Sequence, residues 1–179
     1  MSKRAVRMAA WLLALAPLAG LAADDAERRA GDVLSYALPL GTLGAELWRG
    51  DRSGALQLAR SFAVTVAASE LLKRSTHVER PDHTNDESFP SGHASRAFAA
   101  AAYVHRRHGI GEAWPLYALA TYVGYTRVQA GRHRWADVAG SAGLALASSW
   151  WLVSPQQTGL QVSAHRARGF SIGWSVALP

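Results

Sequence analysis

The 179-residue sequence contains no cysteine. That absence excludes disulfides, thiolate chemistry and cysteine-based zinc sites. The sequence also has no uninterrupted apolar run of about 20 residues, whereas a polytopic membrane protein repeats such runs along its length. With 49% hydrophobic residues and a mean hydropathy of -0.02, the composition is typical of a globular protein. A chain of this length is sufficient for one domain with its own hydrophobic core.

Acidic residues are fewer than basic ones, with 13 Asp and Glu against 19 Lys and Arg. Three of the cations, Lys3, Arg4 and Arg7, lie close to the start of the sequence. The excess that remains without them is small and spread along the chain, so it does not predict a nucleic-acid-binding surface. A mild positive balance is instead suited to an anionic substrate.

The first 23 residues have the layout of a secretory signal peptide, with a basic start, an apolar middle and a small-residue end. Cleavage is expected after Ala22 or Ala23, because Pro17 and Gly20 interrupt the apolar segment. An uncleaved membrane anchor is the alternative. Cleavage releases the rest of the chain into the periplasm or another extracytoplasmic compartment, and an anchor holds it on the membrane facing the periplasm.

Apolar residues recur at helical spacing in five segments between residues 24 and 155. Clusters of Gly, Pro and short polar residues separate these segments, and residues 75–90 are predicted to form a loop. Asp32 is a candidate cap for the first helix, and Pro39 is predicted to kink or break it. The pattern therefore predicts a mainly α domain, a compact helical bundle. The predicted helices cover residues 32–48, 53–73, 91–108, 112–129 and 135–153.

Residues 156–179 alternate between apolar and smaller side chains, which is strand periodicity. The alternating positions lie on either side of a predicted turn at residues 166–169, so we predict a C-terminal β-hairpin. Because an isolated hairpin is only marginally stable in water, we expect it to pack on the helical domain. Contact with a membrane or a partner protein is the alternative.

The turn Pro90-Ser91-Gly92-His93 opens an alanine-rich segment. A helix N-terminus offers unpaired backbone N–H groups and a positive dipole potential, which together favour anions. Gly92 lets an anion approach the backbone, and Ser91 can cap the helix or donate a hydroxyl hydrogen bond. His93 can act there as an acid or a base. Taken alone, these residues fit an ordinary helix cap followed by an incidental histidine equally well.

His133 and Asp137 are four residues apart, so on a helix they share one face. The carboxylate can then bond one imidazole nitrogen, fix the tautomer and leave the other nitrogen free for nucleophilic attack. Arg127 lies six residues before His133, across a break at Gly131, and can fold back towards the same point. Taken alone, the pair fits a surface helix start with a His–Asp cap better than a catalytic pair.

Lys73 and Arg80 add positive charge upstream of the turn. Lysine supplies a point charge, and arginine supplies a planar fork that matches two phosphate oxygens. Isolated basic residues are most often solvated surface groups, so these two gain significance only from the other clusters. The histidines do not predict a metal site, because their spacing matches no common zinc pattern.

Together these residues resemble the three-part signature of the type 2 phosphatidic acid phosphatase superfamily. The superfamily also contains bacterial non-specific acid phosphatases and vanadium haloperoxidases. One departure is Thr126, where the family usually has serine before the arginine; the hydroxyl is kept, but the added methyl group can shift Arg127. The matching parts, in order and in spacing, are Lys73 with Arg80-Pro81, then Pro90-Ser91-Gly92-His93, then Arg127 with His133 and Asp137.

The resemblance implies a role for each matching residue. His133 would be the nucleophile that forms a phosphohistidine, and Asp137 would orient it. His93 would protonate the leaving oxygen and then activate water. Such a site needs no metal ion and no other cofactor, because fixed cations and a helix N-terminus neutralise the phosphoryl group. The phosphoryl oxygens would be held by Lys73, Arg80, Ser91, Gly92 and Arg127.

We therefore predict a metal-independent phosphatase that hydrolyses phosphate monoesters, with the helical fold of the phosphatidic acid phosphatases and haloperoxidases. The substrate is left open between phosphorylated or pyrophosphorylated lipids and soluble phosphate esters, and no nucleic-acid partner is expected. The predicted helices are too short and too interrupted by polar residues for full membrane spans. That interpretation favours a soluble or peripheral periplasmic enzyme, with membrane contact at most peripheral.

Two alternatives to this function stay open at the level of sequence. A vanadium haloperoxidase would use the same residues to hold vanadate, with His133 as its ligand. A non-catalytic envelope protein would use them to bind phosphate or a lipid headgroup, with the hairpin as a docking element. The presence of His93, His133 and Asp137 together favours an enzyme.

Overall fold

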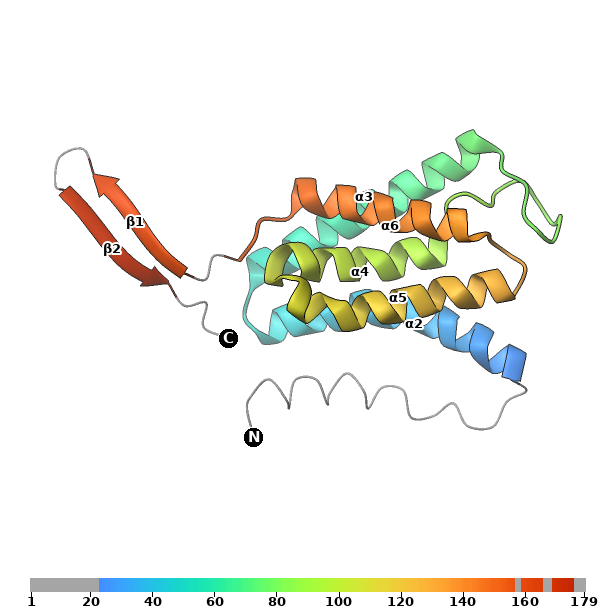
Figure 1. The fold of residues 1–179 in the computed structure, drawn as a ribbon, viewed down its shortest axis with the longest axis horizontal. Coiled ribbons are helices and arrows are strands. Elements are labelled where there is room, and N and C mark those ends of the chain that lie inside the picture. Colours follow the sequence, from blue (N-terminus) through green and yellow to red (C-terminus); the bar gives the residue numbers. More distant parts are fainter. Residues whose placement is uncertain (1–22, 157–158, 166–168, 176–179) are drawn as a thin grey trace.

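The computed structural model describes residues 23–156, 159–165 and 169–175. Within these ranges the chain forms five helices followed by two strands (Figure 1). The predicted mainly α bundle is confirmed. The predicted leader, apart from Ala23, lies outside the described residues. The helices are α2 (Ala23–Trp48), α3 (Arg52–Thr76), α4 (Gly92–His108), α5 (Ile110–Gln129) and α6 (Trp135–Leu152).

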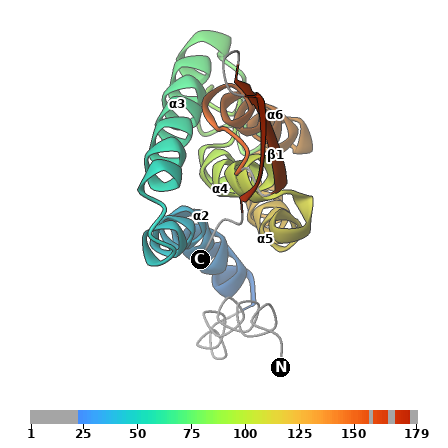
Figure 2. The ribbon, with the colours of Figure 1, turned by 90° about the vertical axis from the view of Figure 1, so that its left-hand side faces the viewer.

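Helix α4 is the centre of the bundle. Its buried alanines, Ala99 to Ala102, have small side chains that let neighbouring helices approach closely. All four other helices contact α4, and the end-on view in Figure 2 shows them arranged around it. Half of the buried hydrophobic core residues therefore lie on this one helix, with Leu38, Leu58 and Val123 among those that complete the core.

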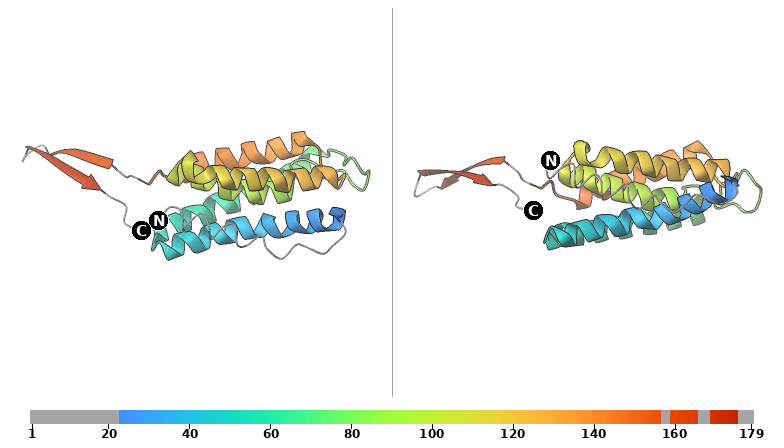
Figure 3. Two further views of the ribbon diagram at one scale, coloured as in Figure 1. Left: turned by 60° about the horizontal axis from the view of Figure 1, so that its bottom comes forward. Right: turned by 90° about the horizontal axis from the view of Figure 1, so that it is seen from below.

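Successive helices run in opposite directions, as the two views in Figure 3 show. Helices α3 and α5 therefore end at the same end of the bundle at which α4 and α6 begin. The long loop between α3 and α4 lies at this end as well (Figure 1). The fold thus brings together the three sequence clusters, which lie at the ends and starts of these helices.

Helix α2 differs from its prediction. It begins at Ala23, nine residues before Asp32, and it continues through Pro39, so the predicted cap and the predicted break are both wrong. Proline removes one backbone hydrogen bond from a helix. Here the adjacent Leu38 is buried in the core, and that packing holds the helix together across the proline.

The lengths of α2 and α3 also differ from expectation. They contain 26 and 25 residues, which at about 1.5 Å per residue makes each nearly 40 Å long. Both are therefore longer than predicted, but the prediction that the helices are too short or too interrupted by polar residues to span a membrane is wrong for α3 alone among the described helices. Helix α3 combines sufficient length with sufficient apolar character, and 28% of its most apolar window is buried.

The C-terminal strands are β1 (Gly159–His165) and β2 (Gly169–Ser175), which pair antiparallel with Val162 opposite Ile172. This is the arrangement that the alternating sequence pattern predicts. The predicted turn falls mostly on residues 166–168, which lie outside the described residues. Packing of the hairpin on the helices stays a prediction.

Candidate active site

A cavity of about 300 Å³ lies at the end of the bundle where the sequence clusters meet. Six of its eight lining residues were predicted from the sequence as site residues, and Arg96 and Arg132 were not. Five of the lining side chains are cations, so the cavity favours an anion. The lining consists of Lys73, Arg80, Gly92, His93, Arg96, Arg127, Arg132 and His133.

His133 lies in the connection between α5 and α6, and its side chain is almost fully buried. Its Nδ1 donates a hydrogen bond of 2.8 Å to the backbone carbonyl of Ser88. Asp137 Oδ2 lies farther away, 3.5 Å from the same nitrogen. The carboxylate is therefore close to the ring, but the prediction that the two residues share a helix face is wrong, because His133 precedes α6. The hydrogen-bond partner of the ring is a backbone carbonyl that no sequence pattern indicated.

Asp137 is held from two sides in the first turn of α6. Its Oδ2 accepts a hydrogen bond of 2.6 Å from the Ser88 hydroxyl and another of 2.8 Å from the Arg134 backbone N–H. The second bond caps α6, and the helix N-terminus favours a negative charge at this position. Ser88 thus contacts His133 through its carbonyl and Asp137 through its hydroxyl, which makes it a site residue that the sequence did not reveal.

The pKa of His133 is far from its usual value. Burial, followed by the positive charge of Arg80, lowers this pKa to about 4, against the opposing effect of Asp137. The imidazole is therefore neutral at neutral pH, and one of its nitrogens keeps a lone pair. A neutral imidazole is the form that a histidine nucleophile requires.

His93 occupies the first turn of α4, where an acidic residue from another helix reaches it. Its Nε2 is 3.0 Å from Oδ1 of Asp32 in α2. The same carboxylate oxygen accepts a hydrogen bond of 2.8 Å from Arg127 Nη1. Asp32, which the sequence suggested only as a helix cap, therefore bridges two residues that line the cavity.

Arg127 is buried, and its guanidinium donates hydrogen bonds to three residues, one of which is Asp32. Besides Asp32, its Nη2 donates to the Arg28 carbonyl at 2.7 Å and its Nε donates to Thr126 Oγ1 at 3.2 Å. The threonine that departs from the family pattern thus supplies its hydroxyl to the arginine. A Cβ on Gly31 would lie 2.1 Å from Thr126 Oγ1, so the close approach of α2 to α5 requires glycine there.

The other cations leave donors available. Arg80 Nε and Arg96 Nε are buried and have no hydrogen-bond partner in the described part of the chain. Lys73 Nζ lies 3.4 Å from Glu70. A Cβ on Gly92 would lie only 3.0 Å from Lys73 Nζ, so glycine leaves the helix N-terminus open towards this amine.

Ser91 differs from the other predicted phosphate-binding residues because it does not line the cavity. Its side chain is buried, and its Oγ has no hydrogen-bond partner among the described residues. Its backbone carbonyl accepts a hydrogen bond of 2.9 Å from Ser141. Asp137 also lies outside the lining, behind His133. Ser91 and Asp137 are therefore the two predicted site residues that do not border the cavity.

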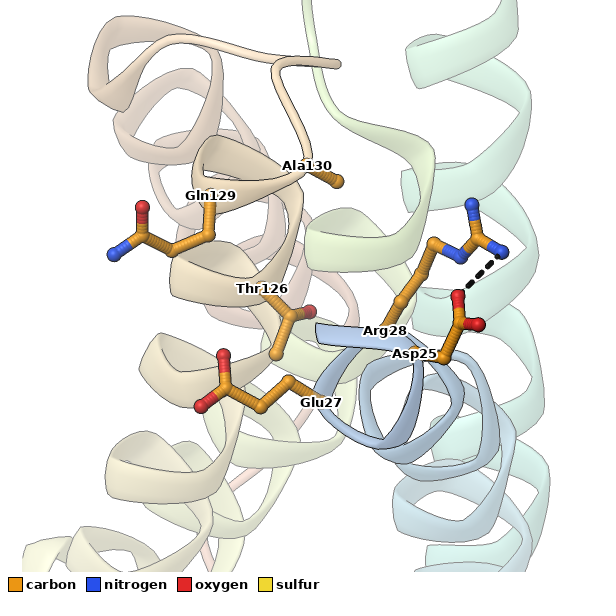
Figure 4. A pocket seen from close by; sticks show the side chains of 6 residues that line it. All are labelled: Asp25, Glu27, Arg28, Thr126, Gln129 and Ala130. Carbon is orange, nitrogen blue, oxygen red and sulfur yellow. Dashed lines mark hydrogen bonds and ion pairs between the residues drawn. The ribbon is translucent and has the colours of Figure 1, made fainter. Parts of the chain in front are cut away.

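A second cavity, of about 190 Å³, lies between the first turns of α2 and the last turn of α5 (Figure 4). Arg28 and Thr126 line it, and both hydrogen-bond to Arg127. Arg127, which lines the first cavity, is therefore hydrogen-bonded to two residues that line the second. The residues that line the second one are Asp25, Glu27, Arg28, Thr126, Gln129 and Ala130.

The bundle and its cation-rich cavity define a helical protein with an anion site that includes two histidines. A family model described as the PAP2 superfamily matches residues 54–159. The match covers more than half of the chain and contains all three sequence clusters, so the chain belongs to the PAP2 superfamily. The resemblance seen in the sequence is thereby confirmed.

Two curated relatives are lipid A phosphatases. A lipid A 4'-phosphatase of Helicobacter pylori is 35% identical over 114 residues, which are 58% of this chain and 57% of the relative. A lipid A 1-phosphatase of Porphyromonas gingivalis is 39% identical over 62 residues, which are 33% of this chain and 14% of the relative. The chain thus spans little more than half of the first relative and a small part of the second.

A solved structure supports the fold. The crystal structure of Aquifex aeolicus LpxE is similar to this chain with a TM-score of 0.62, and the match covers 73% of this chain and 84% of that one. The identity is 19%. At that identity the likeness establishes the helical architecture.

Proposed function

We propose that the protein is a phosphatase that hydrolyses the phosphate monoester of a lipid through a phosphohistidine at His133. The arrangement of His133 carries the proposal. A carbonyl accepts but cannot donate, so the bond to Ser88 places the ring proton on Nδ1 and leaves the lone pair on Nε2. Nε2 is then the nitrogen available to attack phosphorus, at the border of a cavity lined by five cations.

In the first step, the Nε2 lone pair of His133 forms a bond to phosphorus while the bond from phosphorus to the leaving oxygen breaks. His93 gives a proton to that oxygen, so the product leaves as a neutral alcohol. Nδ1 keeps its proton, and the ring carries positive charge. Asp137, 3.5 Å away and held by Ser88, stabilises that charge.

In the second step, water attacks the phosphohistidine. His93, now neutral, takes a proton from the water as the new phosphorus–oxygen bond forms and the phosphorus–nitrogen bond breaks. His133 returns to its neutral form, and inorganic phosphate leaves. Both histidines are then restored, so the cycle is balanced in protons and in bonds.

We propose that this chemistry runs without a metal ion. Phosphoryl transfer requires positioning and charge neutralisation, which the five cations and the N-terminus of α4 can supply. Within the described residues, no group of three or more His, Cys, Asp or Glu side chains is arranged to hold a metal ion. The histidines are instead distributed between hydrogen bonds and ion pairs.

A phosphorylated lipid is the substrate class that we favour. The two curated relatives are named as lipid A phosphatases. The outer surface of the bundle also suits a lipid environment, because α3 turns polar residues inward and apolar residues outward. Ser61, Thr65 and Ser69 are buried on α3, whereas Leu56 and Leu71 are exposed by 58% and 69%.

Helices α2 and α6 likewise turn charged residues inward. Glu46 is fully buried on α2, and the single charged residue of α6, Asp137, is buried as well. Four exposed tryptophans lie at the end of the bundle opposite the site, where indole rings suit the boundary between lipid and water. They are Trp48, Trp114, Trp150 and Trp151. We propose that these helix faces contact the acyl region of a bilayer and present the cavity to phosphorylated headgroups.

We place the site outside the cytoplasm, in the periplasm or facing it, on the basis of the leader-like residues 1–23. The bundle over residues 24–155 would then be the catalytic domain, with the hairpin as an accessory element. A reporter fusion at residue 156 checks this placement: alkaline phosphatase activity of the fusion in intact cells is expected. Fluorescence from a cytoplasmic-only reporter at the same position would contradict it.

A substrate panel tests the function. Wild-type protein is assayed on a lipid phosphate and on p-nitrophenyl phosphate, with and without EDTA, beside His133→Ala and His83→Ala. His83 is an exposed loop histidine that pairs with Glu79 away from the cavity, so it is the matched control. We expect EDTA-insensitive phosphate release that only His133→Ala abolishes. Equal activity of His133→Ala and wild type would overturn the mechanism.

A further inference from the structure

Asp32 is the one acidic residue that touches two residues of the cavity lining within the described part of the chain. Its Oδ1 lies 3.0 Å from Nε2 of His93 and 2.8 Å from Nη1 of Arg127. The carboxylate is half-exposed, whereas the Arg127 guanidinium with which it pairs is buried and itself lines the cavity. Its position therefore calls for an explanation in terms of the site.

The helix that carries Asp32 lies outside the family match. The match covers residues 54–159, whereas α2 covers Ala23–Trp48. Helix α2 nevertheless contacts both α4 and α5, which carry His93 and Arg127. Asp32 is thus an addition to the site from a part of the chain that the three-part signature does not include.

The charges around His93 explain why a carboxylate is useful there. A histidine that donates a proton must first hold it. Burial, followed by the repulsion from Arg96 and Arg127, opposes the protonated ring and lowers the pKa of His93 to about 4. An acidic group in contact with the ring offsets this repulsion, and Asp32 is positioned to do so. The titratable and charged groups that face His93 are Asp32 from α2, Lys73 from α3, Arg96 from α4, Arg127 from α5, Arg80 from the loop before α4, and Arg132 and His133 from the α5–α6 connection.

We propose that Asp32 is a positioning residue for the proton-donating step at His93. Its carboxylate stabilises the imidazolium form of His93 and orients the Arg127 guanidinium in the same contact. In the reaction the imidazolium gives its proton to the leaving oxygen, and the ring regains a proton from the attacking water. Asp32 keeps its charge throughout and neither gains nor loses a bond.

This inference rests on the proposed phosphatase function, and leaving-group dependence separates it from other roles. An aryl phosphate with a good leaving group needs little protonation, whereas an alkyl phosphate needs it fully. The test therefore compares kcat for p-nitrophenyl phosphate and for a short-chain alkyl phosphate across pH. The variants are Asp32→Asn, which removes the charge, and Asp32→Glu, which keeps it.

For Asp32→Asn we expect kcat on the alkyl phosphate to fall by about 10- to 100-fold, part of the roughly 100-fold or greater contribution of general acid catalysis. On p-nitrophenyl phosphate the fall is expected to be several times smaller. The alkaline limb of the alkyl-phosphate profile should move to lower pH by about one unit or more, because an opposite charge at contact distance has been removed. Asp32→Glu should recover most of the rate.

Asp25→Asn is the matched control, because Asp25 is an exposed carboxylate of the same helix that pairs with Arg28. It should leave both rates and the profile unchanged. Equal losses of kcat on the two substrates would overturn the proposal. A lower KM with an unchanged pH profile would also overturn it, because Asp32 would then compete with the phosphate group for binding. If Asp32→Asn does not fold, a failure of Asp32→Glu to keep the wild-type profile overturns it. Wild-type protein inactive on both substrates would instead refute the proposed function itself.

Discussion

The hydroxyl of Ser88 donates a hydrogen bond of 2.6 Å to Oδ2 of Asp137, and both residues are buried. Through its carbonyl, the same serine accepts a hydrogen bond from Nδ1 of His133. The carboxylate and the imidazole are therefore coupled through one residue of the preceding loop. A side-chain substitution of Ser88 can separate the two links, because it removes the hydroxyl and keeps the carbonyl.

We predict that Ser88→Ala lowers kcat by about 10-fold or more, since a hydrogen bond to a buried charged group contributes roughly 1.5–3 kcal/mol. KM should change little, because the cations of the cavity are untouched. Steady-state kinetics with p-nitrophenyl phosphate checks the prediction. Ser75→Ala is the control, because the Ser75 hydroxyl bonds only to a carbonyl of its own helix in the exposed end of α3. Unchanged kcat in Ser88→Ala would show that Asp137 needs no support from Ser88.

The low pKa of His133 predicts that the protein loses part of its folding stability as the pH falls. Burial, followed by the charge of Arg80, lowers this pKa to about 4 in the folded protein, against about 6.5 in an unfolded chain. Between these values the unfolded state binds the proton and the folded state does not. The contribution is therefore complete above pH 6.5 and is lost as pH falls from 6.5 towards 4.

Urea unfolding at pH 7 and pH 5 measures this loss. We expect the wild type to lose about 2 kcal/mol more than His133→Asn between these two pH values. The comparison with the variant removes the effects of every other titrating group. Equal losses in the two proteins would contradict a lowered pKa at His133.

Removing the charge of Arg80 should raise the pKa of His133 and weaken phosphate binding. Arg80 is the first charged group, after burial itself, that lowers this pKa. We predict that Arg80→Gln moves the NMR titration midpoint of His133 upward and raises the inhibition constant of inorganic phosphate by about 10-fold, as expected for one charge-assisted contact. Arg134→Gln is the control, since that side chain is exposed and donates to the Glu79 carbonyl. A midpoint that stays at its wild-type value would show that burial alone sets the pKa.

Gly31 and Gly44 offer a matched pair on α2. A Cβ at position 31 would meet Thr126 and Arg127, whereas nothing lies within 4 Å of a Cβ at position 44. We predict that Gly31→Ala destabilises the fold by about 1–3 kcal/mol through overpacking and lowers kcat. Gly44→Ala should stabilise the helix by roughly 0.5–1 kcal/mol and leave kcat unchanged. Thermal unfolding and kinetics of the two variants check this, and similar behaviour of both would refute the close approach of α2 to α5.

The proposed membrane contact predicts that a charge on the outer face of α3 weakens binding to lipid. Val64 is exposed in the middle of this helix, between buried serine and threonine residues. We predict that Val64→Glu reduces co-flotation with lipid vesicles several-fold, because a charge in the acyl region costs about 2.5 kcal/mol or more. Activity on p-nitrophenyl phosphate should be retained, which controls for folding, and Val64→Leu should float like the wild type. Unchanged flotation of Val64→Glu would place this face in water.

The location of most site residues was predictable because the chemistry sits at helix ends. Lys73 lies in the last turn of α3 and Gly92 opens α4, so antiparallel packing alone brings them together. The short spacing of His133 and Asp137 in the sequence likewise predicted that these two residues lie close together. These relations depend on local periodicity, which a sequence displays directly.

The contacts of Ser88 and Asp32 were not predictable in the same way. The contact of Ser88 with His133 uses a backbone carbonyl, which has no sequence signal. The second depends on how closely α2 approaches α5, and that approach is set by Gly31 and by a helix start nine residues earlier than the capping pattern indicated. Capping propensity is a weak local preference, and here the wider packing of α2 overrides it.

The contacts of α2 with Arg127 have a consequence for how the protein acquires activity. The carbonyl of Arg28 and the carboxylate of Asp32 hold two different nitrogens of this guanidinium, and the same carboxylate meets His93. A chain in which α2 has not yet docked would contain every residue of the three-part signature and still lack these supports. Under the proposed phosphatase function, hydrolysis would begin only when the bundle is complete, so a partly assembled protein would not act on phosphate esters.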